Sequence, residues 1–235
     1  MIRNLKRKVL RHGVHLVVFA VGVSAGVFMY HRTYSSNVDA TLESLDDSIT
    51  RLSVINSMVS LDENTAARVV LVNHIAQILK ERGKFTLSAA VATANAIADN
   101  YKHYKISPAL QLALIEAESG FDGQVTSHAG ARGLTQVMPL TGKMVVTMDG
   151  RTWDEGMLLD PAENVRVGIA YLDMLITDYK KRGNGIDAEH AALTAYNMGP
   201  TALNNRLYEG DKGQSVYSRK VLKLEQRYIS KYGLF

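Results

Sequence analysis

The residues best suited to chemistry lie in segment 113–138. There an apolar helical run ends in Glu118 and Ser119, and after a glycine-rich stretch the Gly-Leu-Thr-Gln sequence at 133–136 adds further polar side chains. Polar groups gathered at the end of an apolar helix are typical of an active site. A carboxylate at the end of such a helix indicates acid–base chemistry.

Glu118 is the better of the two candidate acids in this helix. On a helix its neighbours three and four residues away are Leu114, Ile115 and Phe121, so its carboxyl lies against apolar surface. Desolvation there raises the pKa of a carboxyl and keeps a proton available near neutral pH, as a general acid requires. Glu116 points elsewhere, and the alternative from spacing alone is that both are exposed helix glutamates.

Four short motifs occur in a fixed order along the chain. They are Glu-Ser-Gly-Phe at 118–121, Ser-His-Ala-Gly-Ala-Arg-Gly-Leu-Thr-Gln-Val-Met-Pro at 127–139, Asp-Pro-Ala-Glu-Asn at 160–164 and Ala-Tyr-Asn-Met-Gly at 195–199. Together they resemble the soluble-lytic-transglycosylase (SLT) family of peptidoglycan-cleaving enzymes, relatives of goose-type lysozyme. The resemblance runs from about residue 97 to residue 222.

The resemblance implies a role for several residues. Glu118 would be the single catalytic carboxylate, needing no cofactor or metal. The substrate-binding residues implied are Ser119, Gln136, Tyr196, Asn197 and Tyr217. Asn164 and Gly168 match helix-packing positions of the family and are interpreted as structural.

Two positions depart from the family pattern. Thr135 stands where relatives commonly have Met, which predicts an altered sugar contact. Glu116 stands where relatives often have a basic or polar residue. If the two carboxylates of this helix faced each other, the pKa of Glu118 would rise further.

The mechanism expected from this resemblance uses one carboxylate. A hydrolytic glycosidase typically places a second carboxylate across the bond, and Asp122, the nearest candidate, lies between glycines that favour the end of the helix. Glu118 would therefore protonate the oxygen of the β-1,4 bond between N-acetylmuramic acid and N-acetylglucosamine, then act as base to form a 1,6-anhydro ring. The alternatives are a lysozyme-type muramidase that hydrolyses the same bond and a non-catalytic glycan-binding assembly protein.

The elements that position these residues are predicted to be helices. Each of the four prolines lies where a helix starts or stops, and no stretch alternates with a period of two. Helices are expected at 63–82, from Thr86 or Ser88 to Tyr104, and at 108–119, 139–147, 162–180, 187–196, 200–208 and 216–232. The expected fold is mainly α, a lysozyme-like catalytic domain at residues 85–235.

The N-terminal part indicates delivery to a membrane. Five of the 27 basic residues lie within the first eleven positions, which we assign to a cytoplasmic segment, and no acidic residue is among them. Residues 13–30 are eighteen positions without charge, a helix of about 27 Å. A transmembrane anchor at 12–31 is predicted in the bacterial inner membrane, with the catalytic domain on the outer side of that membrane, in the periplasm. The alternative is a signal peptide cleaved near Ser24.

Residues 32–84 are expected to form a helical stalk. Its apolar seam, with heptad spacing, comprises Val38, Leu42, Leu45, Ile49, Leu52 and Val59. The seam fits either self-association through residues 38–59 or ordinary helix packing.

Other classes of function are disfavoured. Beyond the first eleven residues 22 basic side chains nearly balance 23 acidic ones, so no nucleic-acid partner is expected. The chain has no cysteine, and its histidines lack the paired helical spacing of a metal site. We interpret the basic residues of segment 212–231 as a solvated helix face, with peptidoglycan stems as an alternative contact.

Overall fold

The computed structural model describes residues 41, 63–183 and 185–234. The chain divides into two compact units, Met1–Asp62 and Glu63–Phe235. The expected cytoplasmic segment, the anchor at 12–31 and all six residues of the heptad seam lie outside the described residues. The unit boundary also falls inside the expected stalk, so the helix at 63–82 packs in the second unit. Among the described helices, none combines the length and apolarity required to cross a bilayer.

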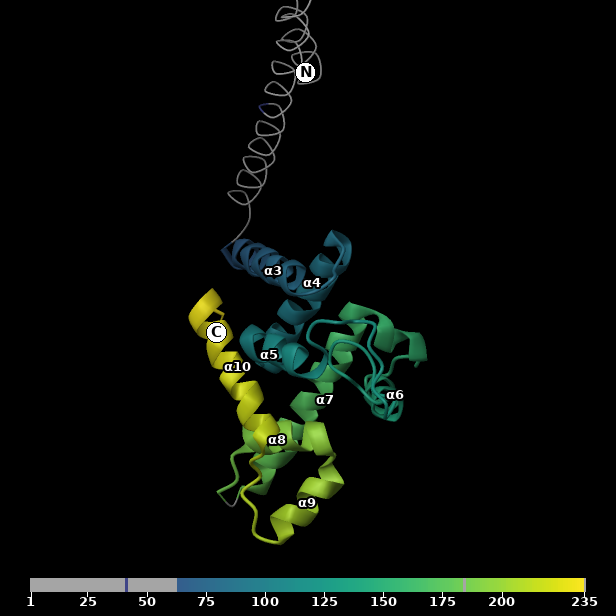
Figure 1. The fold of residues 1–235 in the computed structure, drawn as a ribbon, viewed down its shortest axis with the longest axis vertical. Coiled ribbons are helices and arrows are strands. Elements are labelled where there is room, and N and C mark those ends of the chain that lie inside the picture. The colour runs from purple at the N-terminus through teal and green to yellow at the C-terminus, as the bar shows by residue number, and fades with distance from the viewer. Residues whose placement is uncertain (1–40, 42–62, 184, 235) are drawn as a thin grey trace, which may run out of the picture. The chain divides into compact units, whose positions relative to one another are not determined.

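The second unit is built from helices, as predicted (Figure 1). Their bounds are α3 Glu63–Arg82, α4 Leu87–Tyr104, α5 Pro108–Ser119, α6 Pro139–Met148, α7 Pro161–Arg182, α8 Ala188–Met198, α9 Pro200–Tyr208 and α10 Val216–Tyr232. A short 3-10 helix, η1 (Glu155–Leu159), was not predicted. Extended pairing in the described part of the chain is limited to isolated bridges of Arg132 with Thr126 and Val137.

The helix starts follow from local sequence. Ser107 caps α5 by accepting a hydrogen bond from the Leu110 N–H at 3.0 Å, and Thr86 caps α4 by accepting one from Ala89 at 3.1 Å. Proline occupies the first turn of α5, α6, α7 and α9, where a missing N–H costs nothing. These boundaries are therefore confirmed within one or two residues.

Gly83 follows the last residue of α3, and close packing explains the glycine there. A glycine after a helix commonly adopts a left-handed conformation, but Gly83 is not among the residues with positive φ. Instead, a Cβ atom at this position would lie 2.7 Å from the carbonyl oxygen of Phe121 and 2.6 Å from the Phe85 ring. Close packing against the chain that leaves α5 requires glycine here.

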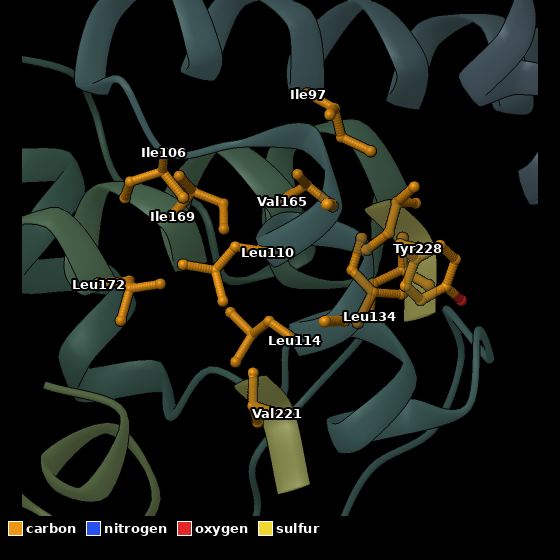
Figure 2. Packing of buried hydrophobic residues seen from close by; sticks show 14 of the residues in the cluster. Ile97, Ile106, Leu110, Leu114, Leu134, Val165, Ile169, Leu172, Val221 and Tyr228 are labelled. Atoms are coloured by element: carbon orange, nitrogen blue, oxygen red, sulfur yellow. The ribbon is translucent and has the colours of Figure 1, made fainter. Parts of the chain in front are cut away.

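α5 is the central helix of the hydrophobic core. Every residue from Pro108 to Ile115 is buried, which is typical of a helix that is apolar on all sides. Figure 2 shows Leu110 and Leu114 among side chains of α4, α7 and α10, with Val221 from α10 at one side. Only the last turn of α5 emerges from this core, and that turn carries Glu118.

A second apolar cluster holds the loop that follows α5. It consists of Val137, Val145, Val146, Leu158 and Val167. These side chains join α6 and η1 to α7, and Gly142 lets the ring of Trp153 approach α6 closely. The Gly-Leu-Thr-Gln loop at 133–136 is thus anchored at its C-terminal side by its own core.

Candidate active site

The backbone around Glu118 is fixed on both sides. Gly120 ends α5 in the left-handed conformation with φ 60°, and its N–H donates to the Glu116 carbonyl at 3.2 Å. Phe121 also has a positive φ, 70°, which costs a non-glycine residue roughly 1–2 kcal/mol. Its side chain is buried in the main core. This burial keeps the turn in place, and strained backbone of this kind is often found beside functional groups.

Tyr217 at the start of α10 lies directly against Glu118. The Tyr217 hydroxyl donates a short hydrogen bond to Glu118 Oε1, which joins residues far apart in the sequence. Burial raises the pKa of Glu118, while the bond from Tyr217 and the charge of Lys220 counteract it in part, leaving the pKa above its ordinary value. Burial and the nearby carboxylate raise the pKa of Tyr217 well above 10, so the phenol stays a donor. The resemblance implied a substrate-binding role for Tyr217, which stays a prediction; its contact with Glu118 was not predicted.

Lys220 is a neighbour of the site that sequence reasoning missed. It lies one turn after Tyr217 on α10, and its Nζ donates to the Ala117 carbonyl at the end of α5, at 3.2 Å. We had interpreted Lys220 as part of a solvated face. The spacing of three residues from Tyr217 was the available signal, because residues three apart share a helix face.

Glu116 belongs to a separate ionic cluster. Its carboxylate contacts Arg82 at 2.6 Å and Arg227 at 2.5 Å, and accepts a hydrogen bond from the Tyr228 hydroxyl at 2.5 Å. Burial by itself would raise the pKa of Glu116, but hydrogen bonds from Arg227 and Tyr228 and the charges of both arginines lower it. Glu116 therefore ties α5 to α3 and α10. Arg227 is exposed, as interpreted, and also pairs with Glu116.

Asn164 holds the loop at 133–136 in shape. Its Oδ1 accepts from the Thr135 N–H at 2.8 Å and from the Thr135 hydroxyl at 2.7 Å. Its Nδ2 donates to the carbonyl oxygens of Arg132 at 2.8 Å and Leu158 at 2.9 Å. All four bonding positions of this fully buried amide are used. The structural interpretation of Asn164 is confirmed.

Two glycines allow the loop to approach α7. A Cβ atom on Gly168 would lie 2.2 Å from Thr135 Oγ1, and one on Gly133 would lie 2.2 Å from the Leu158 carbonyl oxygen. Thr135 itself is fully buried between Asn164 and Gly168. The side chain of Thr135 therefore faces the protein interior and is not itself a sugar contact, while the altered contact expected from the replacement of Met stays a prediction.

Tyr196 on α8 lies close enough to Glu118 to interact with its charge. Its hydroxyl donates to the Thr135 carbonyl at 2.9 Å, and its ring lies 5.4 Å from that of Tyr171. Burial, followed by the charge of Glu118, raises the pKa of Tyr196. The phenol is thus a fixed, neutral group near the acid that links α8 to the loop at 133–136.

Gln136 is held in a strained conformation. Its φ is 50°, and its Nε2 donates to the carbonyl oxygens of Val125 at 3.1 Å and Gly133 at 2.9 Å. Because both N–H groups are used, the side-chain oxygen is the atom available to a ligand. Gln136 therefore offers a fixed acceptor on a half-buried surface.

The structure gives the two remaining predicted residues weaker support. The Ser119 hydroxyl donates to the Ile115 carbonyl of its own helix at 3.1 Å, next to Glu118. Asn197 is exposed beside Tyr196, and no hydrogen bond of its side chain is found within the described residues. Neither has a direct contact with Glu118, so their predicted roles depend on the substrate.

No second carboxylate faces Glu118 in the described part of the chain. Asp122 is exposed, and its Oδ1 accepts from the Gln124 N–H at 2.9 Å in a turn. Among the described residues no group of three His, Asp or Glu side chains could hold a metal ion. The arrangement therefore presents one buried acid, a phenol that donates to it, a nearby cation and a fixed amide oxygen.

Comparison with known proteins places this geometry in a family. The family model described as "Transglycosylase SLT domain" matches residues 95–217. Membrane-bound lytic murein transglycosylase C from Haemophilus influenzae (strain PittEE) is 34% identical over 131 residues, covering 54% of this chain and 36% of that protein. The protein of the same name from Edwardsiella ictaluri (strain 93-146) is 36% identical over 119 residues, 49% of this chain and 33% of its own. The chain thus matches only about a third of the length of these curated relatives.

Solved structures support the same fold. An inactive mutant of the lytic transglycosylase Slt from Pseudomonas aeruginosa superposes with a TM-score of 0.51 at 24% identity, over 59% of this chain and 24% of that one. The 70-kDa soluble lytic transglycosylase in complex with bulgecin A gives a TM-score of 0.50 at 21% identity, over 83% and 35%. The chain belongs to the SLT transglycosylase domain family, as the sequence motifs had indicated.

Proposed function

We propose that this protein is a lytic murein transglycosylase that cleaves the β-1,4 bond between N-acetylmuramic acid and N-acetylglucosamine. The observation that carries the proposal is the state of Glu118, a largely buried carboxyl with a raised pKa that accepts a hydrogen bond from Tyr217. Membership of the SLT family supports the same substrate class. Curated relatives named lytic murein transglycosylases point to the same reaction.

The site suits a residue that acts first as acid and then as base. Burial of Glu118 favours its protonated form, which donates its proton to the glycosidic oxygen as that bond breaks. The carboxylate that remains is stabilised by the Tyr217 hydroxyl and the charge of Lys220. It then accepts the proton of the muramoyl 6-hydroxyl while that oxygen bonds to C1, so the 1,6-anhydro ring closes and Glu118 regains its proton.

The surrounding residues would bind the glycan. The oxygen of Gln136 is oriented to accept a hydrogen bond from a sugar hydroxyl or amide, because its amide nitrogen is already occupied. Ser119 and Asn197 are proposed to add contacts next to the acid and beside Tyr196. Tyr196 supplies a rigid wall, since its hydroxyl is bound to Thr135.

Product analysis tests the proposal. The full-length protein is expected to release 1,6-anhydromuropeptides from purified sacculi, detected by mass spectrometry, and Glu118→Gln is expected to abolish release. Asp122→Asn is the matched control, because this exposed carboxylate lies closest in sequence and is expected to be dispensable. Reducing-end products that depend on Asp122 would instead establish a hydrolytic muramidase. Glycan binding with no turnover at any pH would establish an assembly protein.

We also propose that the enzyme is anchored in the bacterial inner membrane by residues 12–31 and acts in the periplasm. The basic segment and the uncharged stretch after it support this orientation. The names of the curated relatives include "membrane-bound". Recovery of the intact chain in the membrane fraction, with the catalytic domain open to protease only from the periplasmic side, is the expected result. A shortened mature chain would show cleavage of a signal peptide.

A further inference from the structure

The start of α10 supplies two groups to the acid. Tyr217 in its first turn donates to Glu118, and Lys220, one turn later, donates to Ala117 in the last turn of α5. The position of the first turn of α10 therefore sets the hydrogen bond to Glu118 and, through the same helix, the position of the nearby cation. What fixes that turn is consequently part of the site.

A capping box of two serines begins α10. The Ser215 hydroxyl accepts from the Ser218 N–H at 3.0 Å, and the Ser218 hydroxyl accepts from the Ser215 N–H at 3.0 Å. Such a box satisfies the first N–H groups of a helix and needs no other partner. Tyr217 lies between the two serines, so any shift of the box moves the phenol.

Side chains of α8 form hydrogen bonds with both hydroxyls of this capping box. Thr194 Oγ1 donates to Ser215 Oγ at 3.0 Å, and His190 Nδ1 lies 2.9 Å from Ser218 Oγ. His190 and Thr194 are four residues apart, so they lie on one face of α8. Thr194 and Ser218 are no more than 1% exposed. Two hydrogen bonds one turn apart fix the rotation as well as the position of the start of α10.

α8 is also hydrogen-bonded to the loop at 133–136. Tyr196, beyond Thr194 on α8, donates to the Thr135 carbonyl in the loop at 133–136. α8 thus connects the residues around Gln136 to the helix turn that carries Tyr217. A hydrogen bond such as that from Tyr217 to Glu118 weakens sharply with small changes of distance or angle.

We propose that His190 and Thr194 are positioning residues that hold the Tyr217 hydroxyl on Glu118 through the Ser215–Ser218 capping box. They do not touch substrate. The expected effect of these two residues on turnover rests on the proposed function of Glu118. Their expected effect on the pKa of the Glu118 carboxyl is independent of that function. The other groups facing Glu118 are Lys220 from α10 and Tyr196 from α8.

The test compares His190→Leu and Thr194→Val, singly and together, with Tyr217→Phe in the full-length protein. His190→Asn and Thr194→Ser retain a hydrogen-bonding atom and serve as rescue variants. Ser230→Ala is the control, because the Ser230 hydroxyl on α10 donates only to Gln226 of the same helix in the described structure. We call His190→Leu and Thr194→Val the clamp variants. Each is expected to reduce turnover about two- to tenfold, which corresponds to the loss of one ordinary hydrogen bond.

The pH dependence separates positioning from a general loss of fold. The Tyr217 bond lowers the pKa of Glu118, so removing it raises that pKa and moves the alkaline limb of activity to higher pH. His190→Leu and Thr194→Val are expected to move the limb in the same direction. They are expected to add nothing in the Tyr217→Phe background, and the rescue variants restore the wild-type profile. A fall in Tm with an unmoved limb, or additive effects, would overturn the inference.

A readout without substrate makes the two proposals independently testable. The NMR signal of the Glu118 carboxyl carbon is followed against pH in protein labelled with ¹³C at glutamate. The signal is assigned because it is missing from the spectrum of Glu118→Gln. The inference expects a higher pKa in both clamp variants than in wild type. Unchanged titration refutes it even if anhydromuropeptides are produced. A raised pKa with no anhydromuropeptides from wild type leaves the positioning role intact and refutes the proposed reaction.

Discussion

Replacing Asn164 by Asp tests whether this side chain holds the loop of the active site. The substitution preserves shape but exchanges the Nδ2 donor for an oxygen. That oxygen would face the carbonyl oxygens of Arg132 and Leu158, which now accept from Nδ2 at 2.8 and 2.9 Å. The two bonds from Thr135 to Oδ1 can remain. The variant therefore removes both hydrogen bonds that this fully buried side chain donates.

The expected cost is large relative to the stability of a domain. The buried Leu158 oxygen would be left without its donor, at a cost of about 1–3 kcal/mol, whereas the Arg132 oxygen still accepts from the Val137 N–H at 3.1 Å and loses one ordinary bond, at about 0.5–1.5 kcal/mol. The free energy of unfolding should therefore fall by about 1.5–4.5 kcal/mol. For a domain of this size that lowers Tm by roughly 3–18 °C. The loss of unfolding free energy should be smaller at acidic pH. A buried carboxyl without a neighbouring cation has a raised pKa, and its protonated form can donate one hydrogen bond.

Thermal unfolding of the full-length protein by circular dichroism measures the effect, and muropeptide release measures its consequence for the site. Asn73→Asp is the control, because Asn73 is exposed on α3 and its replacement should change stability by no more than about 0.5 kcal/mol. Turnover below Tm should also fall in Asn164→Asp, since the loop carrying Gln136 loses its support. A Tm equal to that of wild type, or an equal loss in the control, would refute the reasoning.

Three further substitutions give distinct expected outcomes. Glu116→Gln should lower Tm at neutral pH and flatten its acid dependence: the lowered pKa of Glu116 gives stability present above its ordinary value of 4.5 and lost as pH falls through the lower folded value. Tm measured against pH checks this, with exposed Glu81→Gln as control, and an unchanged acid slope would contradict it. Gly168→Ala places a Cβ 2.2 Å from Thr135 Oγ1 and should cost about 1–3 kcal/mol or more in denaturant unfolding, whereas Gly123→Ala, with its nearest contact at 3.5 Å, should be tolerated. Lys220→Met should raise the pKa of Glu118 and move the alkaline limb of turnover to higher pH; the same shift in the exposed control Lys223→Met would show that bulk charge is responsible.

The sequence by itself determined the helices and the choice of Glu118 as the candidate acid. Helix starts were predictable because Ser107, Thr86 and the prolines act on N–H groups within three or four residues of themselves. The preference for Glu118 over Glu116 followed from helical facing, which depends only on spacing. The family followed from several motifs in order, and the comparison with the SLT domain confirms it.

Tertiary structure alone decided how the acid is surrounded. Tyr217 and Lys220 reach α5 across about a hundred residues of chain, and the clamp from His190 and Thr194 joins α8 to α10. A sequence pattern reports which face of a helix a residue occupies, but not which other helix packs there. For this reason the sequence could not show that the exposed Lys220 and Arg227 bond to α5, or that the Thr135 side chain faces the interior. Only the packing of α5 against α10 and of the loop against α7 turns these side chains toward their partners.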